Sequence, residues 1–309
     1  MESVASSWQW GFFIALVLAM LALDLGVIHR KEHRVGLREA IVWSLLWTLV
    51  ALLFNAWIYR RFGSHAGLEF LTGYIIERSL SFDNIFVFVV IFNYFAVPAE
   101  HQHRVLFWGI LGALVSRGLF IGLGTVLLTR FEWLMLVFGA FLVYTGIKIL
   151  RGQETEVQPE HNPVLRLFRR FVPLSAQYHG KRFFIRRHRR TLATPLMLVL
   201  VVVETTDVIF AVDSIPAVFG VTRDPFIVFT SNIFAILGLR ALYFLLASLM
   251  SRFRFLSYGL GLVLLFVGAK MLIHDWYDVP IHLSLGIVLG VLVVAIALSL
   301  LVAPPRPGG

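Results

Sequence analysis

The sequence contains no cysteine, so disulfide bonds and thiolate metal sites are excluded. Charged residues are scarce as well, because they make up 15% of the 309 residues where a soluble domain carries about 25%. Hydrophobic residues reach 59%, and they come in repeated apolar blocks. Each block is about 20 residues long, which as a helix crosses about 30 Å of hydrocarbon. The chain is therefore predicted to be a multi-pass membrane protein.

The apolar blocks predict an all-α fold of about nine transmembrane helices in one transmembrane domain, residues 1–309. The expected spans are 8–28, 38–59, 68–95, 104–128, 131–150, 194–220, 225–249, 254–273 and 281–303. The long polar segment 151–193 carries ten Lys and Arg, and we expect a solvated basic loop that touches anionic lipid headgroups.

Lys and Arg are unevenly divided between alternate loops, with 18 on one side of the membrane and 4 on the other. The positive-inside rule then places the N-terminus outside, and the C-terminus and loop 151–193 in the cytoplasm of a bacterial-type inner membrane. This topology accounts for most of the net charge of +9, so nucleic acid is not expected as a partner. No cleavable signal peptide is expected, because the start of the chain lacks a basic region.

Part of the sequence repeats. GAFLVYTGIKIL at 139–150 aligns without gaps with GLVLLFVGAKML at 261–272, and Arg117 matches Arg240 at nearly the same offset. The strings that begin at Asp83 and Asp207 match as well. Three landmarks at a shared offset make chance a poor explanation.

The two copies cover residues 68–150 and 194–273, with three expected helices in each. Because three is odd, the copies must enter the membrane from opposite sides. Such an inverted-topology repeat is typical of transporters whose substrate binds near the midplane, where the copies meet.

Acidic residues inside the expected spans are the main candidates for function. Each charge costs at least about 2.5 kcal/mol to insert, so a membrane carboxylate is a functional candidate by default. The candidate metal ligands are Glu77, Asp83, Asn84, Glu204, Asp207 and Asp213. The alternative for any single acid is a packing role, paired with an arginine.

Helical spacing limits which of these side chains can meet. Glu204 and Asp207 are three residues apart and share a face. Asp213 faces elsewhere on a continuous helix, but Pro216 predicts a kink or break at 212–216 that frees backbone oxygens there. In the first copy, Asp83 with Asn84 is expected at the centre of the membrane. Glu77 is expected nearer the outer mouth or paired with Arg78.

Basic residues inside the spans have two possible roles. Arg117 and Arg240 are expected to compensate the charge of the carboxylates, or alternatively to displace the ion during transport. Lys148 and Lys270, near helix ends, are expected to extend to the membrane surface.

The ligand types available narrow the class of metal. All ten histidines lie in loops or at helix ends, and those such as His101 and His103 are expected to be solvated. A site at the midplane would then be all-oxygen, which suits Mn²⁺, Mg²⁺ or Ca²⁺ and argues against Cu⁺ and Zn²⁺.

Two strings resemble a known family. ERSLSFDNIFVFVVIF at 77–92 and TTDVIFAVDSIPA at 205–217 are similar to the signature segments of the TerC family of integral membrane proteins, and the similarity extends over roughly 8–303. The resemblance implies a relationship to lysine-exporter-like transporters and export of Mn²⁺ from the bacterial cytoplasm. It also implies that the family's acidic membrane positions are the five acids named above.

The function expected from the sequence is export of a divalent cation in exchange for protons, with no permanently bound cofactor. The sequence contains no P-loop, which argues against transport driven directly by ATP. The spans also lack a pair of nucleophile and base, so an intramembrane enzyme is not expected. The alternatives are a membrane scaffold or metallation factor that docks with the secretion machinery, or an exporter of Ca²⁺, Mg²⁺ or an organic solute.

Overall fold

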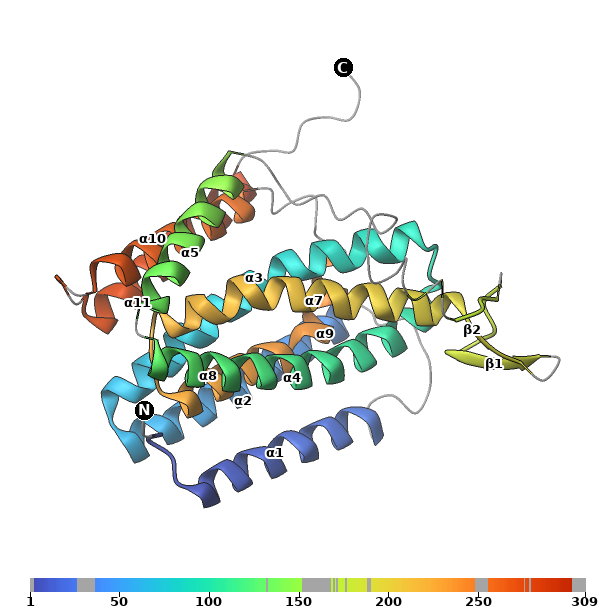
Figure 1. Ribbon diagram of the computed structural model, residues 1–309, viewed down its shortest axis with the longest axis horizontal. Coiled ribbons are helices and arrows are strands. Elements are labelled where there is room, and N and C mark those ends of the chain that lie inside the picture. The colour runs from blue at the N-terminus through green and yellow to red at the C-terminus, as the bar shows by residue number, and fades with distance from the viewer. Residues whose placement is uncertain are drawn as a thin grey trace.

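The computed structural model describes residues 3–26, 37–131, 133–151, 168, 170, 172–175, 177–187, 190–247, 255–274, 276–277 and 279–301. This part of the chain forms ten helices and one β-hairpin (Figure 1). The helices are α1 (Ser7–Gly26), α2 (Leu37–Phe62), α3 (Ser64–Tyr94), α4 (Ala99–Arg130), α5 (Leu134–Leu150), α7 (Pro195–Phe219), α8 (Pro225–Leu237), α9 (Leu239–Ala247), α10 (Leu256–Ile273) and α11 (Ile281–Leu301). The hairpin pairs β1 (Phe184–Arg187) with β2 (Arg190–Ala193) in antiparallel fashion.

Six helical stretches are long and apolar enough to cross a membrane, which confirms the expected multi-pass, all-α class. They are Arg38–Phe62, Glu100–Leu128, Pro195–Phe219, Pro225–Leu245, Leu256–Ile273 and Ile281–Leu301. The apolar stretches of α1 and α5 are shorter. The number of nine spans therefore stays a prediction.

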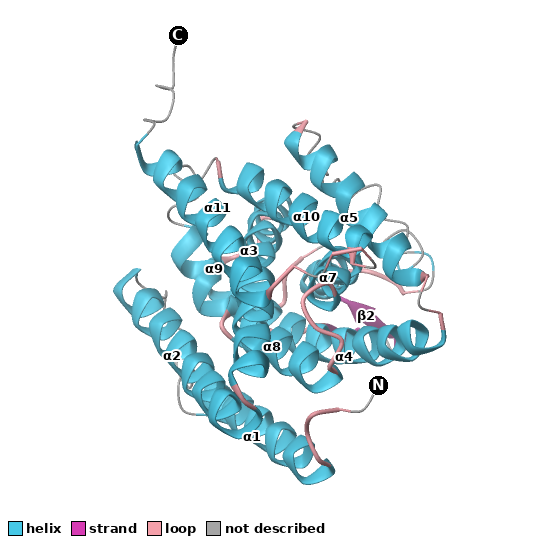
Figure 2. Ribbon diagram, turned by 90° about the vertical axis from the view of Figure 1, so that its left-hand side faces the viewer, coloured by secondary structure: helices cyan, strands magenta, loops and turns pink. Residues whose placement is uncertain are grey.

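The helices form two groups that run at an angle to each other. α1 to α4 and α7 to α9 run lengthwise along the bundle, while α5, α10 and α11 cross it together (Figure 1). Seen from one end, α1 and α2 lie side by side, with α5, α10 and α11 on the opposite side (Figure 2). Phe13, Phe54 and Phe234 pack ring against ring where α1, α2 and α8 meet.

α5 and α10 pack through glycines. A Cβ atom added to Gly139 would lie 3.0 Å from the carbonyl oxygen of Gly268, and one added to Gly268 would lie 2.7 Å from that of Gly139. Gly146 and Gly261 approach each other in the same way, at 2.7 and 3.2 Å. The two backbones are in direct contact at both places, so a larger residue would force the helices apart.

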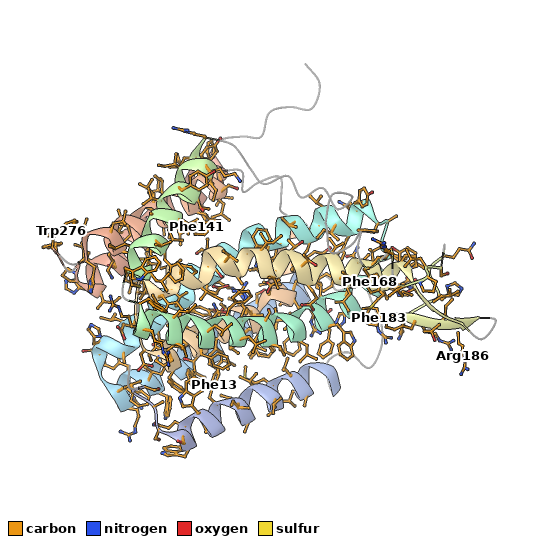
Figure 3. The ribbon with its side chains drawn as sticks, viewed as in Figure 1. Phe13, Phe141, Phe168, Phe183, Arg186 and Trp276 are labelled. Carbon is orange, nitrogen blue, oxygen red and sulfur yellow. The ribbon has the colours of Figure 1, made fainter. Side chains whose placement is uncertain are left out.

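The two ends of the bundle differ in structure. At the hairpin end, Phe168, Leu174, Tyr178 and Phe183 pack against the ends of the lengthwise helices. The hairpin itself projects beyond the helices, with Arg186 far from them (Figure 3). Loop 151–193 was expected to be a solvated basic loop, and described basic residues such as Lys181, Arg182 and Arg186 are exposed. The expectation did not include the apolar side chains, which pack against the helix ends and cover part of this end of the bundle.

At the opposite end, local sequence sets where helices start. Gly63 separates α2 from α3 with φ of +94°, a conformation that favours glycine. Asp224 caps α8, because its Oδ1 accepts hydrogen bonds from the backbone N–H of Phe226 at 2.8 Å and of Ile227 at 3.1 Å. Pro225 follows in the first helical position, where its missing N–H costs nothing.

The expected break in the helix of Pro216 is wrong. α7 runs without interruption to Phe219, and Pro216 lies in its last turn, where little helix remains to be disturbed. The next span, Pro225–Leu245, has an interruption of one residue at Gly238, where α8 ends and α9 begins.

Candidate functional site

Arg117 of α4 lies at the centre of the lengthwise helices and contacts two carboxylates. Its Nη1 donates to Oε1 of Glu77 on α3, and its Nη2 donates to Oδ1 of Asp207 on α7 at 3.1 Å. Nε adds a longer bond of 3.4 Å to Oδ2 of Asp207. Arg117 and Glu77 are 0% exposed and Asp207 is 5% exposed, so these charges are sealed inside the protein.

Two neutral side chains complete this group. Ser214 lies seven residues after Asp207, about two turns along α7, and its Oγ accepts from Arg117 at 3.2 Å. Asn232 of α8 accepts from Arg117 through Oδ1 at 3.3 Å and donates through Nδ2 to Glu77 at 2.9 Å. Both are buried. We call Glu77, Arg117, Asp207, Ser214 and Asn232 the central cluster.

The central cluster places one guanidinium between carboxylates from two predicted repeat copies. A buried ion pair of this kind is costly to break, because removing one partner leaves an uncompensated charge, at about 3–5 kcal/mol. If Arg117 moved away, the cluster would present carboxylate, hydroxyl and amide oxygens to one point. This set of donors suits a hard divalent cation.

The partner expected for Glu77 is corrected by the structure. Glu77 does not pair with Arg78 or lie at a mouth of the protein, because Arg117 holds it in the central cluster. Adjacent residues of a helix point about 100° apart, so Arg78 faces another neighbour. Its Nη1 donates to the carbonyl oxygen of Ala235 at 3.1 Å, beside the break at Gly238.

The remaining predicted residues lie at several places. Glu204 is half-buried, and its carboxylate packs against Gly112 of α4 so closely that a Cβ at Gly112 would collide with it. Asn84 and Arg240 are buried in α3 and α9. The side chains of Asp83 and Asp213 lie outside the described part of the chain, so their assignment as ligands stays a prediction.

Asn232 is a member of the central cluster that the sequence analysis did not select. An available signal was its place in the apolar run FIVFTSNIFAIL, where an amide must find hydrogen-bond partners inside the protein.

Little free space adjoins the central cluster. A cavity of about 10 Å³ touches Asp207 and lies among Gly109, Ala113 and Val203, which is the space of one water molecule at most. Across the described residues, no three His, Asp or Glu side chains are gathered closely enough to hold a metal ion. In this conformation the guanidinium of Arg117 fills the space between the two carboxylates.

A second cavity, of about 420 Å³, lies at the end of the bundle opposite the hairpin. Glu69 of α3 and Lys270 of α10 line it, with His65, His274 and His282 also contributing. Lys270 was expected to extend to the membrane surface but is 9% exposed and faces this cavity. We call this space the Glu69 cavity.

The expectation that histidines are solvated holds at the Glu69 cavity, where His274 and His282 are exposed. It is wrong for His101, which is buried at the hairpin end in the first turn of α4. His101 therefore lies among protein side chains and not in solvent.

Comparison with known proteins identifies the relatives of this chain. A protein of Escherichia coli K12 with the provisional name membrane-bound redox modulator Alx is 47% identical over 308 residues, which cover 97% of this chain and 96% of that protein. An uncharacterized membrane protein of Myxococcus xanthus is 52% identical over 305 residues, covering 99% and 96%. One from Rickettsia bellii is 37% identical over 293 residues, covering 95% and 97%. No solved structure matches. The model of the integral membrane protein TerC family matches residues 62–306, and the chain belongs to that family.

Proposed function

We propose that this protein exports a divalent metal cation, most readily Mn²⁺, and that the ion takes the place of Arg117 between Glu77 and Asp207. The observation that carries the proposal is the central cluster itself. Two sealed carboxylates from different helices converge on a single cationic group and pair with it. An intramembrane site of this kind is expensive, which favours a functional role over a packing role.

The donor set supports the choice of ion. The cluster offers oxygen donors, and the chain has no thiolate to favour Cu⁺ or Zn²⁺. Space for about one water beside Asp207 means that the ion sheds most of its hydration shell there. Mg²⁺ gives up water reluctantly, so this dry site favours Mn²⁺ or Ca²⁺ over Mg²⁺. Asp83, Asn84, Glu204 and Asp213 are proposed as further stations or ligands.

The proposed architecture is nine spans with an inverted repeat and an external N-terminus. The glycine contacts between α5 and α10 support the repeat. The alignment pairs Gly139 with Gly261 and Gly146 with Gly268. If a two-fold axis relates the copies, a contact between Gly139 and Gly268 implies an equivalent contact between the residues aligned with them, Gly261 and Gly146. Both contacts are present. On this topology the hairpin end is cytoplasmic and the Glu69 cavity is external.

Export of a divalent ion needs a driving force. Moving two positive charges outward against 100 mV costs about 4.6 kcal/mol. We propose proton antiport, because carboxylates can exchange a metal ion for protons. When the site is open to the cytoplasm, the metal ion displaces Arg117 from Glu77 and Asp207. When the site is open to the outside, protons and Arg117 take the place of the metal ion.

The name of the redox-modulator relatives suggests another activity, of which one form can be tested against the sequence. Thiol–disulfide exchange requires cysteine, and the sequence has none.

A flux assay tests the proposal. Purified protein in proteoliposomes should transport Mn²⁺ when a pH gradient is imposed, and Asp207→Asn and Glu77→Gln should each lower the rate by at least about tenfold, because each removes one of the charges that hold the ion. Glu100→Gln is the matched control, since this carboxylate is exposed in the first turn of α4, outside the central cluster. Transport that continues unchanged in both cluster variants would eliminate the central cluster as the ion site.

A further inference from the structure

The Glu69 cavity is unlike the central cluster in size. At about 420 Å³ it exceeds the roughly 180 Å³ that six water molecules occupy in liquid water. A divalent ion with its complete octahedral shell therefore fits inside. The exposed residues His65, His274 and His282 among its lining show that the cavity reaches the surface.

The charges in the Glu69 cavity are mixed. The side chain of Glu69 is 15% exposed, and it is attracted by the ammonium of Lys270 and by His65, while Asp224 repels it. Arg223 adds a second fixed positive charge to the lining. Within the lining, one carboxylate attracts a cation and two basic groups repel it, and Asp224 outside the lining offsets part of this repulsion. Such a site holds a cation weakly.

The position of Glu69 relates the two sites. Glu69 precedes Glu77 by eight residues on α3, about 12 Å along the helix. Gly73 lies between them, and a Cβ there would come within 2.9 Å of Ser231 Oγ and 3.2 Å of Val218 Cγ1. In this conformation the packing at Gly73 separates the central cluster from the Glu69 cavity.

We propose that the Glu69 cavity is a low-affinity release site for the hydrated divalent cation. Glu69 receives the ion when it leaves the central cluster, and Lys270 replaces the ion at Glu69 once it has departed. The two basic groups keep affinity low, so the exported ion leaves the cavity and external ions do not refill it. This inference rests on the proposed export of a divalent cation from the hairpin end.

Inhibition of efflux by external Mn²⁺ tests the release site. Right-side-out membrane vesicles are loaded with Mn²⁺, and the initial rate of efflux is measured while external Mn²⁺ is raised. Glu69→Gln should raise the external concentration that halves the rate by about fivefold, because it removes the attracting charge. Lys270→Met should lower it by about fivefold, because it removes the competing charge. Arg61→Gln, an equal change of charge at the same end but outside the cavity, should leave it unchanged.

The opposite directions of the two shifts separate this role from a structural one, since a folding defect lowers efflux in both variants without moving the inhibitory concentration in opposite directions. If Glu69→Gln does not fold, Lys270→Met still decides the matter. Efflux that depends on Asp207 but is inhibited equally in wild type and Lys270→Met overturns the release site alone. Absence of Mn²⁺ efflux from the wild type overturns the export proposal, and the release site with it.

Discussion

The central cluster and the Glu69 cavity place similar charges in different surroundings. In the cluster, Arg117 and its two carboxylates are sealed beside a space of about 10 Å³. In the cavity, Glu69 and Lys270 face about 420 Å³ that reaches the surface. Because the attraction between charges falls as the surrounding dielectric rises, the first group is strongly held and the second is weakly held. On the proposed function, this difference in surroundings would separate the site that selects the ion from the site that releases it.

The two ends of the protein differ in a related way. One end holds the Glu69 cavity, whereas apolar side chains of segment 168–193 cover the other. Tyr178 fixes this cover by donating a hydrogen bond to the carbonyl oxygen of Phe95 at 2.7 Å. Burial raises the pKa of Tyr178, so the phenol keeps the proton that it donates. The conformation is therefore hollow at one end and covered at the other.

The largest effect is expected from removing the charge of the central cluster. Arg117→Met should lower the free energy of unfolding by about 3–5 kcal/mol, because it leaves Glu77 and Asp207 buried without a counter-charge. Lys270→Met removes the same charge beside water and should cost about 1 kcal/mol or less. Thermal unfolding in detergent measures both. Equal losses of stability would refute the contrast between a dry and a wet site.

A smaller effect is expected on how readily water-soluble reagents reach the two sites. Because the protein has no native cysteine, a single introduced cysteine reports on its own position. In detergent-solubilised protein, Val221→Cys in the Glu69 cavity should react with a water-soluble thiol reagent at least about tenfold faster than Val203→Cys beside Asp207, because the buried position reacts only after local opening. Similar rates at the two positions would mean that water reaches both sites equally.

The smallest effect is expected at the hairpin end. The guanidinium of Arg104 lies 5.0 Å from the ring centre of Phe183, so Arg104→Ala should loosen the cover by about 0.5–1 kcal/mol. Chymotrypsin should then cleave at Phe183 and Phe184 about two- to fivefold faster, as opening becomes easier by that amount. Arg186→Ala is the control, because Arg186 is exposed and lies away from the helices. A cleavage rate that does not change with Arg104→Ala would show that this contact does not hold the cover.

The sequence predicted the charged members of the central cluster for a physical reason. Glu77, Arg117 and Asp207 lie within long apolar stretches, where an ionised group is tolerated only when it is paired. Which pairs form was not predictable from local spacing. Arg78 is next to Glu77 in sequence, whereas Arg117 is forty residues away and reaches it only because α7 and α8 pack against both α3 and α4.

The fold was predictable in class and less so in detail. Apolar length predicts helices well, and the structure has helices close to the expected ranges. The effect of Pro216 depends on its distance from the end of α7, which local propensity does not determine. The need for glycine at 238 was missed because it depends on a residue distant in sequence: Arg78 occupies the space that a side chain at Gly238 would need. The cover at the hairpin end likewise depends on long-range contacts such as that of Phe183 with Trp108.

The guanidinium of Arg117 has a consequence for handling the protein. Proteins whose anionic sites are neutralised only by bound metal lose structure when a chelator removes it. Here the polypeptide supplies its own counter-ion to Glu77 and Asp207. EDTA during purification should therefore leave the melting temperature unchanged, and the metal-free protein should be a stable sample for structure determination.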